Sequence, residues 1–150
     1  MKAVDAHSID LWSIGTCLYE LFTGHVLFTG RTNNDMLRLM MAVKGRFPNK
    51  LLRAHFRAYE NLNLDPHFDA DLKFKQWDID PVSGKPLMKL VDIAAPAINL
   101  STTLLSAKAG SDDRRLVVQL ADLLDKSLSL DPSKRIGVLD ALRHPFFTTK

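Results

Sequence analysis

Residues Ser8 to Gly24 read SIDLWSIGTCLYELFTG, and this stretch decides the fold that the sequence predicts. Ser8 can cap a helix through its hydroxyl group, and Asp10 in the first turn favours the positive end of the helix dipole. Gly24 follows the last apolar residues, where helices commonly end in a left-handed turn. Between these ends the apolar side chains lie nearly all round the cylinder, which is typical of a helix covered by other helices on all sides. The stretch is too short to span a bilayer, which requires about 20 apolar residues.

The composition is that of an ordinary globular domain. The chain has 150 residues, of which 46% are hydrophobic and 25% are charged, so one domain with a real core is expected. Its net charge of +3 is too small to indicate nucleic-acid binding by itself. The single cysteine, Cys17, excludes an internal disulfide and favours a reducing compartment. No signal peptide or transmembrane stretch is recognisable, so neither a membrane nor nucleic acid is predicted as a direct partner.

Further segments of the chain show the 3.6-residue periodicity of amphipathic helices. The predicted helices cover about residues 32 to 45, 48 to 57, 111 to 130 and 138 to 144. Ser111 is expected to cap the third of these helices, with Asp112 and Asp113 at the positive end of its dipole. The chain outside the opening helix is therefore predicted to be mainly helical.

The middle of the chain, from Tyr59 to Gly110, has weak periodicity and many turn signals. Short alternating runs at residues 72 to 77 and 87 to 91 allow a weak hairpin. Residues 94 to 109 are small and mixed in polarity and are predicted to be mostly loop. A segment of this length inside a compact domain is either an insertion with its own role or partly disordered.

Two motifs, in this order along the chain, resemble the C-terminal lobe of eukaryotic protein kinases. The first is D-x-W-S-x-G, formed by Asp10, Trp12, Ser13 and Gly15. The second is L-x-x-D-P-x-x-R at residues 128 to 135, followed by L-x-H-P-F-F at residues 142 to 147. The stretch LFTGRT at residues 27 to 32 also resembles a turn of the CMGC group, and the chain is most similar to its pre-mRNA-splicing serine/threonine kinases of the PRP-four type.

This resemblance implies an all-α fold: a helical C-lobe subdomain of the protein kinase fold with a long, partly irregular insert. Residues 1–150 would form a partial kinase domain, from the central helix of the lobe onward, with the insert at about residues 59–110. The intact family transfers phosphate from Mg-ATP to serine and threonine hydroxyls of protein substrates. The resemblance implies an intracellular protein, nuclear rather than cytoplasmic, whose partners are protein substrates, spliceosomal proteins or the missing N-terminal part of the kinase.

The resemblance carries four structural residues onto this chain: Asp10, Trp12, Gly15 and Arg135. Asp10 would hold the backbone of the catalytic loop, and Arg135 would pair with the glutamate of the A-P-E motif. The Gly-rich loop, the phosphate-binding lysine, H-R-D, D-F-G and A-P-E are all absent from this sequence. No catalytic, cofactor-binding or metal-binding residue is therefore predicted, and we expect a fragment that is inactive alone.

In a complete kinase, the catalytic loop and activation segment would cover one side of the opening helix. Because both are missing from this sequence, one face near Asp10, Leu11 and Ile14 is expected to be exposed.

Several alternatives remain open at this point. Asp10 could act only on the helix dipole, and Arg135 could be a solvated surface cation. The face formed by Lys50, Arg53 and Arg57 is either solvated or a docking surface for an acidic partner. The five histidines lack the paired spacing of metal ligands. The whole chain could also be a non-catalytic, kinase-like module that binds other proteins.

Overall fold

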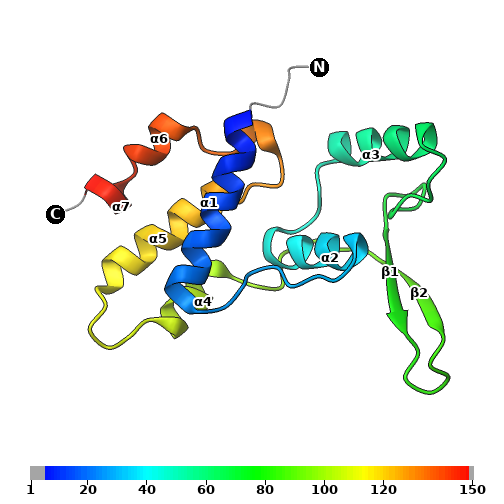
Figure 1. The fold of residues 1–150 in the computed structure, drawn as a ribbon, viewed down its shortest axis with the longest axis horizontal. Helices are drawn as coiled ribbons and strands as arrows, with labels where there is room; N and C mark the ends of the chain where they lie inside the picture. Colours follow the sequence, from blue (N-terminus) through cyan, green and yellow to red (C-terminus); the bar gives the residue numbers. More distant parts are fainter. Residues whose placement is uncertain (1–5, 149–150) are drawn as a thin grey trace. The chain divides into compact units, whose positions relative to one another are not determined.

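The computed structural model describes residues 6–148 and divides the chain into two compact units. The first unit contains the described residues up to Leu27 and those from Ile98 onward, and the second contains residues 28 to 97. The first unit holds α1 (Ala6–Thr23), α4 (Leu100–Ala107), α5 (Arg114–Ser127), the 3₁₀ helix η1 (Pro132–Lys134), α6 (Val138–Leu142) and α7 (Pro145–Thr148). The second holds α2 (Asn33–Lys44), α3 (Asn49–Asn61) and strands β1 (Phe74–Ile79) and β2 (Pro86–Val91) (Figure 1).

The opening helix α1 ends as the sequence predicts but begins earlier. Gly24 has φ of 73°, the left-handed conformation that glycine adopts without steric cost, and its N–H donates to the Glu20 carbonyl at 2.8 Å. The prediction that Ser8 is the N-cap is wrong, because the helix already includes Ala6. The Ser8 hydroxyl is used elsewhere: it donates to the Pro132 carbonyl at 3.3 Å and so joins α1 to η1.

The core of the first unit forms where α1 meets α5 and α6. Helices α1 and α5 lie side by side (Figure 1), and buried Leu11 packs with Leu123 and Ala141. Gly15 lies in a tight contact, because a Cβ atom there would lie 3.1 Å from the Leu128 side chain and 3.2 Å from the Cβ of Ser127. A larger side chain at this position would force Leu128 and Ser127 to shift.

Helix α4 forms within a segment that the sequence analysis assigned mostly to loop. Asn99 caps it by accepting a hydrogen bond from the Thr102 N–H at 3.0 Å. Leu100 and Leu104, one turn apart, are both buried, so tertiary packing outweighs the weak periodicity of the segment. The predicted cap of α5 was also wrong, because Asp113 rather than Ser111 accepts from the Arg115 N–H at 2.7 Å.

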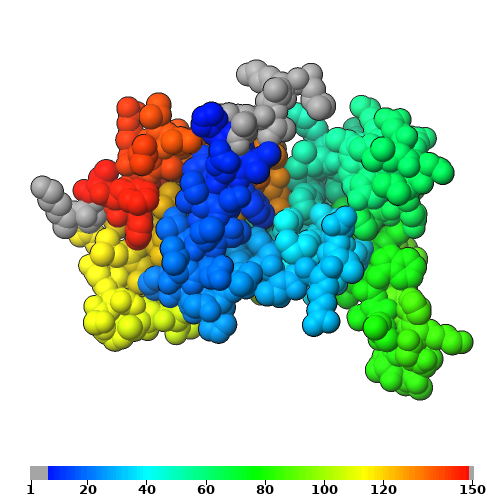
Figure 2. All heavy atoms as spheres, viewed as in Figure 1, coloured from blue at the N-terminus to red at the C-terminus, as the bar shows by residue number. Residues whose placement is uncertain are grey.

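The second unit combines two helices with a β-hairpin, so the all-α prediction holds only as a mainly helical fold. The hairpin pairs β1 and β2 antiparallel, with Trp77 opposite Met88, and agrees with the weak hairpin expected there. In Figure 2 the hairpin, in green, stands out from the helices of the same unit. Its base is anchored by Phe74, which packs in a core with Met41 and Leu52 of α2 and α3.

A buried amide ties α2 to the outer edge of β1. The Asn34 side chain donates to the Lys75 carbonyl at 2.8 Å and accepts from the Trp77 N–H at 3.2 Å. It thereby satisfies two backbone groups of the edge strand, as a neighbouring strand would. The α2 helix itself starts with a capping box, in which Thr32 and Asp35 each bond to the other's backbone N–H. The predicted insert bounds, residues 59–110, stay a prediction.

Candidate functional site

Arg135 bonds to two segments of the first unit, the start of α1 and the chain that follows α5. Its Nε and Nη2 atoms donate to the Ser129 carbonyl at 3.1 and 2.8 Å. Its Nη1 atom donates to the Ser8 carbonyl and, at 3.2 Å, to the Ser8 hydroxyl. The planar guanidinium can serve both groups at once because its donors point in fixed, divergent directions. Arg135 therefore fixes the first turns of α1 against the chain that leaves α5.

The Trp12 ring packs against the guanidinium group of Arg135. The guanidinium carbon of Arg135 lies 5.1 Å from the centre of the Trp12 ring, which is a cation–π contact. Burial lowers the pKa of Arg135, while the nearby Asp131 carboxylate acts in the opposite direction. The side chain remains charged, because an arginine is protonated at any physiological pH. The alternative of a freely solvated cation is therefore wrong for Arg135.

The turn before Arg135 explains why the sequence reads D-P-S-K-R. Asp131 accepts from the Ser133 N–H at 3.0 Å and from the Ser133 hydroxyl at 2.7 Å, which caps η1. Pro132 fits the first position of this short helix because it needs no N–H there. One residue later, the Ile136 N–H donates to the Lys126 carbonyl at 3.2 Å. The η1 turn and the hydrogen bond from Ile136 to Lys126 together orient the Arg135 side chain toward α1.

One face of α1 is left open to solvent. Asp10 lies on it, and Ile14 and Leu21 are 52% and 83% exposed. Cys17 shares this exposed face. The apolar pattern of the sequence predicted that α1 is covered on all sides, and this prediction is wrong. The exposure of Asp10 and Ile14 agrees with the expectation for a chain that lacks the catalytic loop and activation segment. Leu11 was also expected on the open side, but it is buried against α5 and α6.

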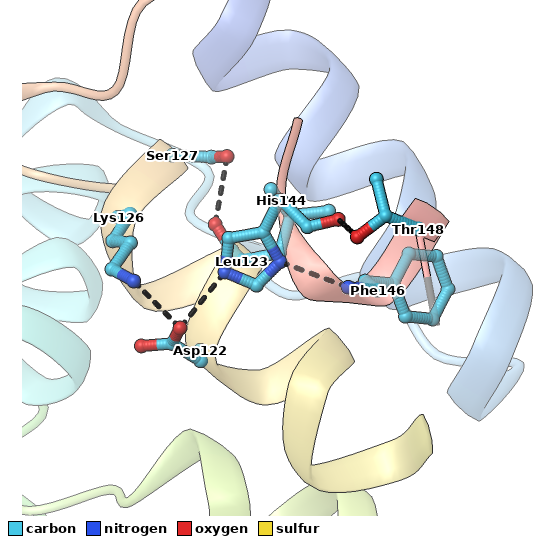
Figure 3. Close-up of polar contacts among 7 residues, drawn as sticks. All are labelled: Asp122, Leu123, Lys126, Ser127, His144, Phe146 and Thr148. Carbon is cyan, nitrogen blue, oxygen red and sulfur yellow. Dashed lines mark hydrogen bonds and ion pairs between the residues drawn. The ribbon is translucent and has the colours of Figure 1, made fainter. Parts of the chain in front are cut away.

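A second polar cluster, which the sequence analysis missed, holds the end of the chain against α5 (Figure 3). The buried His144 ring lies with Nε2 2.8 Å from the Asp122 carboxylate, and its Nδ1 accepts from the Phe146 N–H at 3.3 Å. This assigns the ring proton to Nε2, which donates to Asp122. Lys126 donates to the same carboxylate oxygen at 2.6 Å. The hydrogen bond from Lys126, followed by that from His144, lowers the pKa of Asp122.

This cluster has the parts of an acid–base pair but no nucleophile. The Ser127 hydroxyl, which is nearby in Figure 3, donates to the Leu123 carbonyl at 2.8 Å instead of to His144. A nucleophilic serine requires its hydroxyl bonded to the base. Asp122 and Lys126 could have been paired from their four-residue spacing, but nothing local connects them with His144. The arrangement is a structural lock for α7.

The described residues contain neither a cluster of metal ligands nor a membrane-spanning helix. Among residues 6–148, no group of three or more His, Cys, Asp and Glu side chains is placed to hold a metal ion. The sequence also has no Gly-rich loop to cradle phosphates. Within the same described range, no helix has both the length and the apolar character needed to cross a membrane.

The chain is similar to known protein kinases over almost its whole length. The protein kinase domain family matches residues 2–147. The chain is 44% identical over 144 residues to serine/threonine-protein kinase prp4 of Schizosaccharomyces pombe, covering 95% of this chain and 29% of that protein. It is 39% identical over 142 residues to serine/threonine-protein kinase prpf4B of Dictyostelium discoideum, covering 93% of this chain and 17% of that protein. Extracellular signal-regulated kinase 1 of Candida albicans is 29% identical over 140 residues, at 93% and 29% coverage.

The matched region includes every anchor described above. The helix with Asp10, Trp12 and Gly15, the turn that presents Arg135 and the His144 lock all lie within residues 2–147. The chain spans less than a third of the length of these curated relatives. It belongs to the protein kinase domain family.

Proposed function

We propose that this chain supplies the C-terminal helices of a serine/threonine kinase and does not transfer phosphate by itself. The observation that carries the proposal is the open apolar face of α1 beside Asp10, in a chain that matches the kinase domain almost throughout. An exposed apolar face of this kind on a small unit calls for a covering surface. Other parts of a kinase domain are the proposed cover.

Each anchor has a proposed part in such an assembly. Arg135, Trp12 and Ser8 hold the start of α1 rigid, so that Asp10 presents its carboxylate at a fixed position. Asp10 would then accept backbone N–H groups of the catalytic loop. Arg135 would pair with the glutamate of the A-P-E motif through the second N–H of Nη2, because its other four N–H groups donate to Ser8 and Ser129.

The cofactor, the location and the cellular role follow from the same similarity. Mg-ATP would bind elsewhere in the intact kinase, because this sequence has neither the Gly-rich loop nor the phosphate-binding lysine of the family. The protein substrates, a role in pre-mRNA splicing and a nuclear location are proposed from the resemblance to the prp4-type kinases. A link to spliceosomal proteins as partners rests on the same ground.

Nucleotide binding by the chain alone tests the proposal. We expect no change in the thermal midpoint of the purified 150-residue chain on titration with Mg-ATP, and no phosphate transfer to a generic serine/threonine substrate. A ligand present at 100 times its Kd would stabilise the folded state by about 2.7 kcal/mol, so binding would be plain. Saturable protection by Mg-ATP would refute the proposal, because this chain would then hold a nucleotide site of its own.

A further inference from the structure

Helix α3 in the second unit carries a cationic surface that the proposed kinase role does not use. Lys50, Arg53 and Arg57 are all exposed, and helical geometry places them within about 60° of one another round the axis. The opposite side of α3 faces inward, with Leu52 buried and Phe56 packed against the core of the unit. We call the three exposed cations the basic face of α3.

The basic face has no acidic counterpart in its own unit. The sequence contains no carboxylate between Asp35 and Glu60, and none of the three cations forms an ion pair within the described residues. Glu60 follows Arg57 by three residues on the same helix, yet no ion pair joins them. The charge of the face is therefore available to a partner.

The three cations of the basic face destabilise α3 when no partner is bound. Lys50 lies in the first turn, where the positive end of the dipole disfavours a cation, and no acidic residue offsets it there. Arg53 follows Lys50 by three residues and precedes Arg57 by four, and both spacings bring like charges together. A bound anionic group would offset both the repulsion among the three cations and the unfavourable interaction of Lys50 with the helix dipole.

We infer that the basic face of α3 docks an acidic segment of a partner protein. The three cations span about 10 Å along the helix axis, which matches carboxylates spaced three and four residues apart on a partner helix. Ala54 lies beside them on the exposed side, and its small side chain permits close approach. This docking is independent of the kinase role proposed above.

The ring-bearing side chains of α3 argue for a protein partner over single-stranded RNA. Non-specific RNA binding combines cations with exposed aromatic rings on which bases stack. The rings of α3 are on its other side, where His55 lies 4.0 Å from Tyr59 and 5.7 Å from Phe68 between ring centres. The basic face therefore offers charge without a stacking platform.

Fluorescence anisotropy with the full 150-residue chain tests the inference. The probe is a labelled 14-residue helical peptide with glutamates three and four residues apart, and its control has glutamine at the same positions. We expect the glutamate peptide to bind about tenfold tighter or more, and this advantage to fade between 0.05 and about 0.5 M salt. A single-stranded RNA of similar charge serves as the competing probe.

Matched charge reversals locate the site. The variant Lys50→Glu, Arg53→Glu, Arg57→Glu should weaken the glutamate peptide by about tenfold or more. The control variant Arg114→Glu, Arg115→Glu, Arg143→Glu makes the same change in net charge on exposed residues of the first unit and should leave binding nearly unchanged. The variant Lys50→Gln, Arg53→Gln, Arg57→Gln should also lose binding, and circular dichroism verifies that this variant is folded.

Three results would overturn the inference. The first is equal binding of the glutamate and glutamine peptides. The second is an equal loss of affinity in both charge-reversal variants, which would mean attraction by net charge alone. The third is tighter binding of the RNA than of the acidic peptide.

Discussion

Removing the Arg135 side chain should destabilise the first unit by about 3 kcal/mol. Two carbonyl groups, those of Ser8 and Ser129, lose a charged donor in Arg135→Ala. The site is only partly buried, so water replaces part of each bond, and a net loss of about 1 kcal/mol for each carbonyl is appropriate. The contact with the Trp12 ring adds about 1 kcal/mol. This sum is a large fraction of the roughly 5–15 kcal/mol by which domains are stable.

Urea denaturation followed by far-ultraviolet circular dichroism measures this loss. Arg135→Lys keeps the charge, but a single ammonium group cannot reach Ser8 and Ser129 together, so it should lose most of the same stability. Arg143→Ala is the matched control, because Arg143 is an exposed cation of the same unit. A double-mutant cycle with Trp12→Phe isolates the ring contact, since phenylalanine keeps a weaker π face.

The reasoning fails if Arg135→Ala changes the free energy of unfolding by less than about 0.5 kcal/mol, as expected for ordinary surface positions. It also fails if Arg135→Lys is as stable as the wild type. In either case the guanidinium would not be the group that holds α1 to the end of α5.

Three further perturbations follow from the structure. Asn34→Asp should cost the second unit about 3–5 kcal/mol, because a carboxylate cannot donate to the Lys75 carbonyl, while Asn33→Asp at the exposed start of α2 should cost nothing; urea denaturation compares them. Burial lowers the pKa of both His55 and His67, so their contribution to stability is full above the unfolded value of about 6.5 and is lost as the pH falls below it. The protection factors of the β1 amides, from which the intrinsic pH dependence of exchange is removed, should therefore fall between pH 7.5 and 5, and the double variant His55→Gln, His67→Gln should flatten this fall; protection factors that stay constant over this range would contradict the prediction. Gly15→Val should destabilise the first unit by about 2–3 kcal/mol through its contact with α5, whereas the same change at exposed Ser13 should cost much less; equal thermal midpoints would refute the close packing.

Local signals in the sequence predicted most of the helical elements correctly. The left-handed Gly24 at the end of α1 depends on a few neighbouring residues, so the local sequence alone predicts it. The failures occurred where distant contacts decide. Ser8 looks like a cap but bonds to Pro132, which is far away in the sequence. Leu104 has weak periodicity around it, yet α4 forms because that side chain is fully buried.

The candidate site was predictable in its members but not in its contacts. Arg135 and Trp12 were both singled out by the sequence, but only the structure shows the cation above the ring and its bonds to Ser8. The lock between His144 and Asp122 could not be derived, because a single histidine before a proline carries no information about its partner. The open face of α1 was expected near Asp10 and Ile14, but the apolar pattern alone does not show that Leu11 points to the core.

We propose above that this chain completes a kinase through the open face of α1. Replacing the matched 144 residues of the Schizosaccharomyces pombe kinase prp4 with this chain tests it directly, with phosphate transfer from Mg-ATP as the measurement. We expect an active chimera in which Asp10→Asn lowers kcat by about tenfold or more, because the proposed role of Asp10 is to hold the backbone of the catalytic loop. Because Asp10 is exposed here, the same substitution should change the stability of the chain alone by less than about 0.5 kcal/mol. A folded but inactive chimera, or one indifferent to Asp10→Asn, would contradict the account.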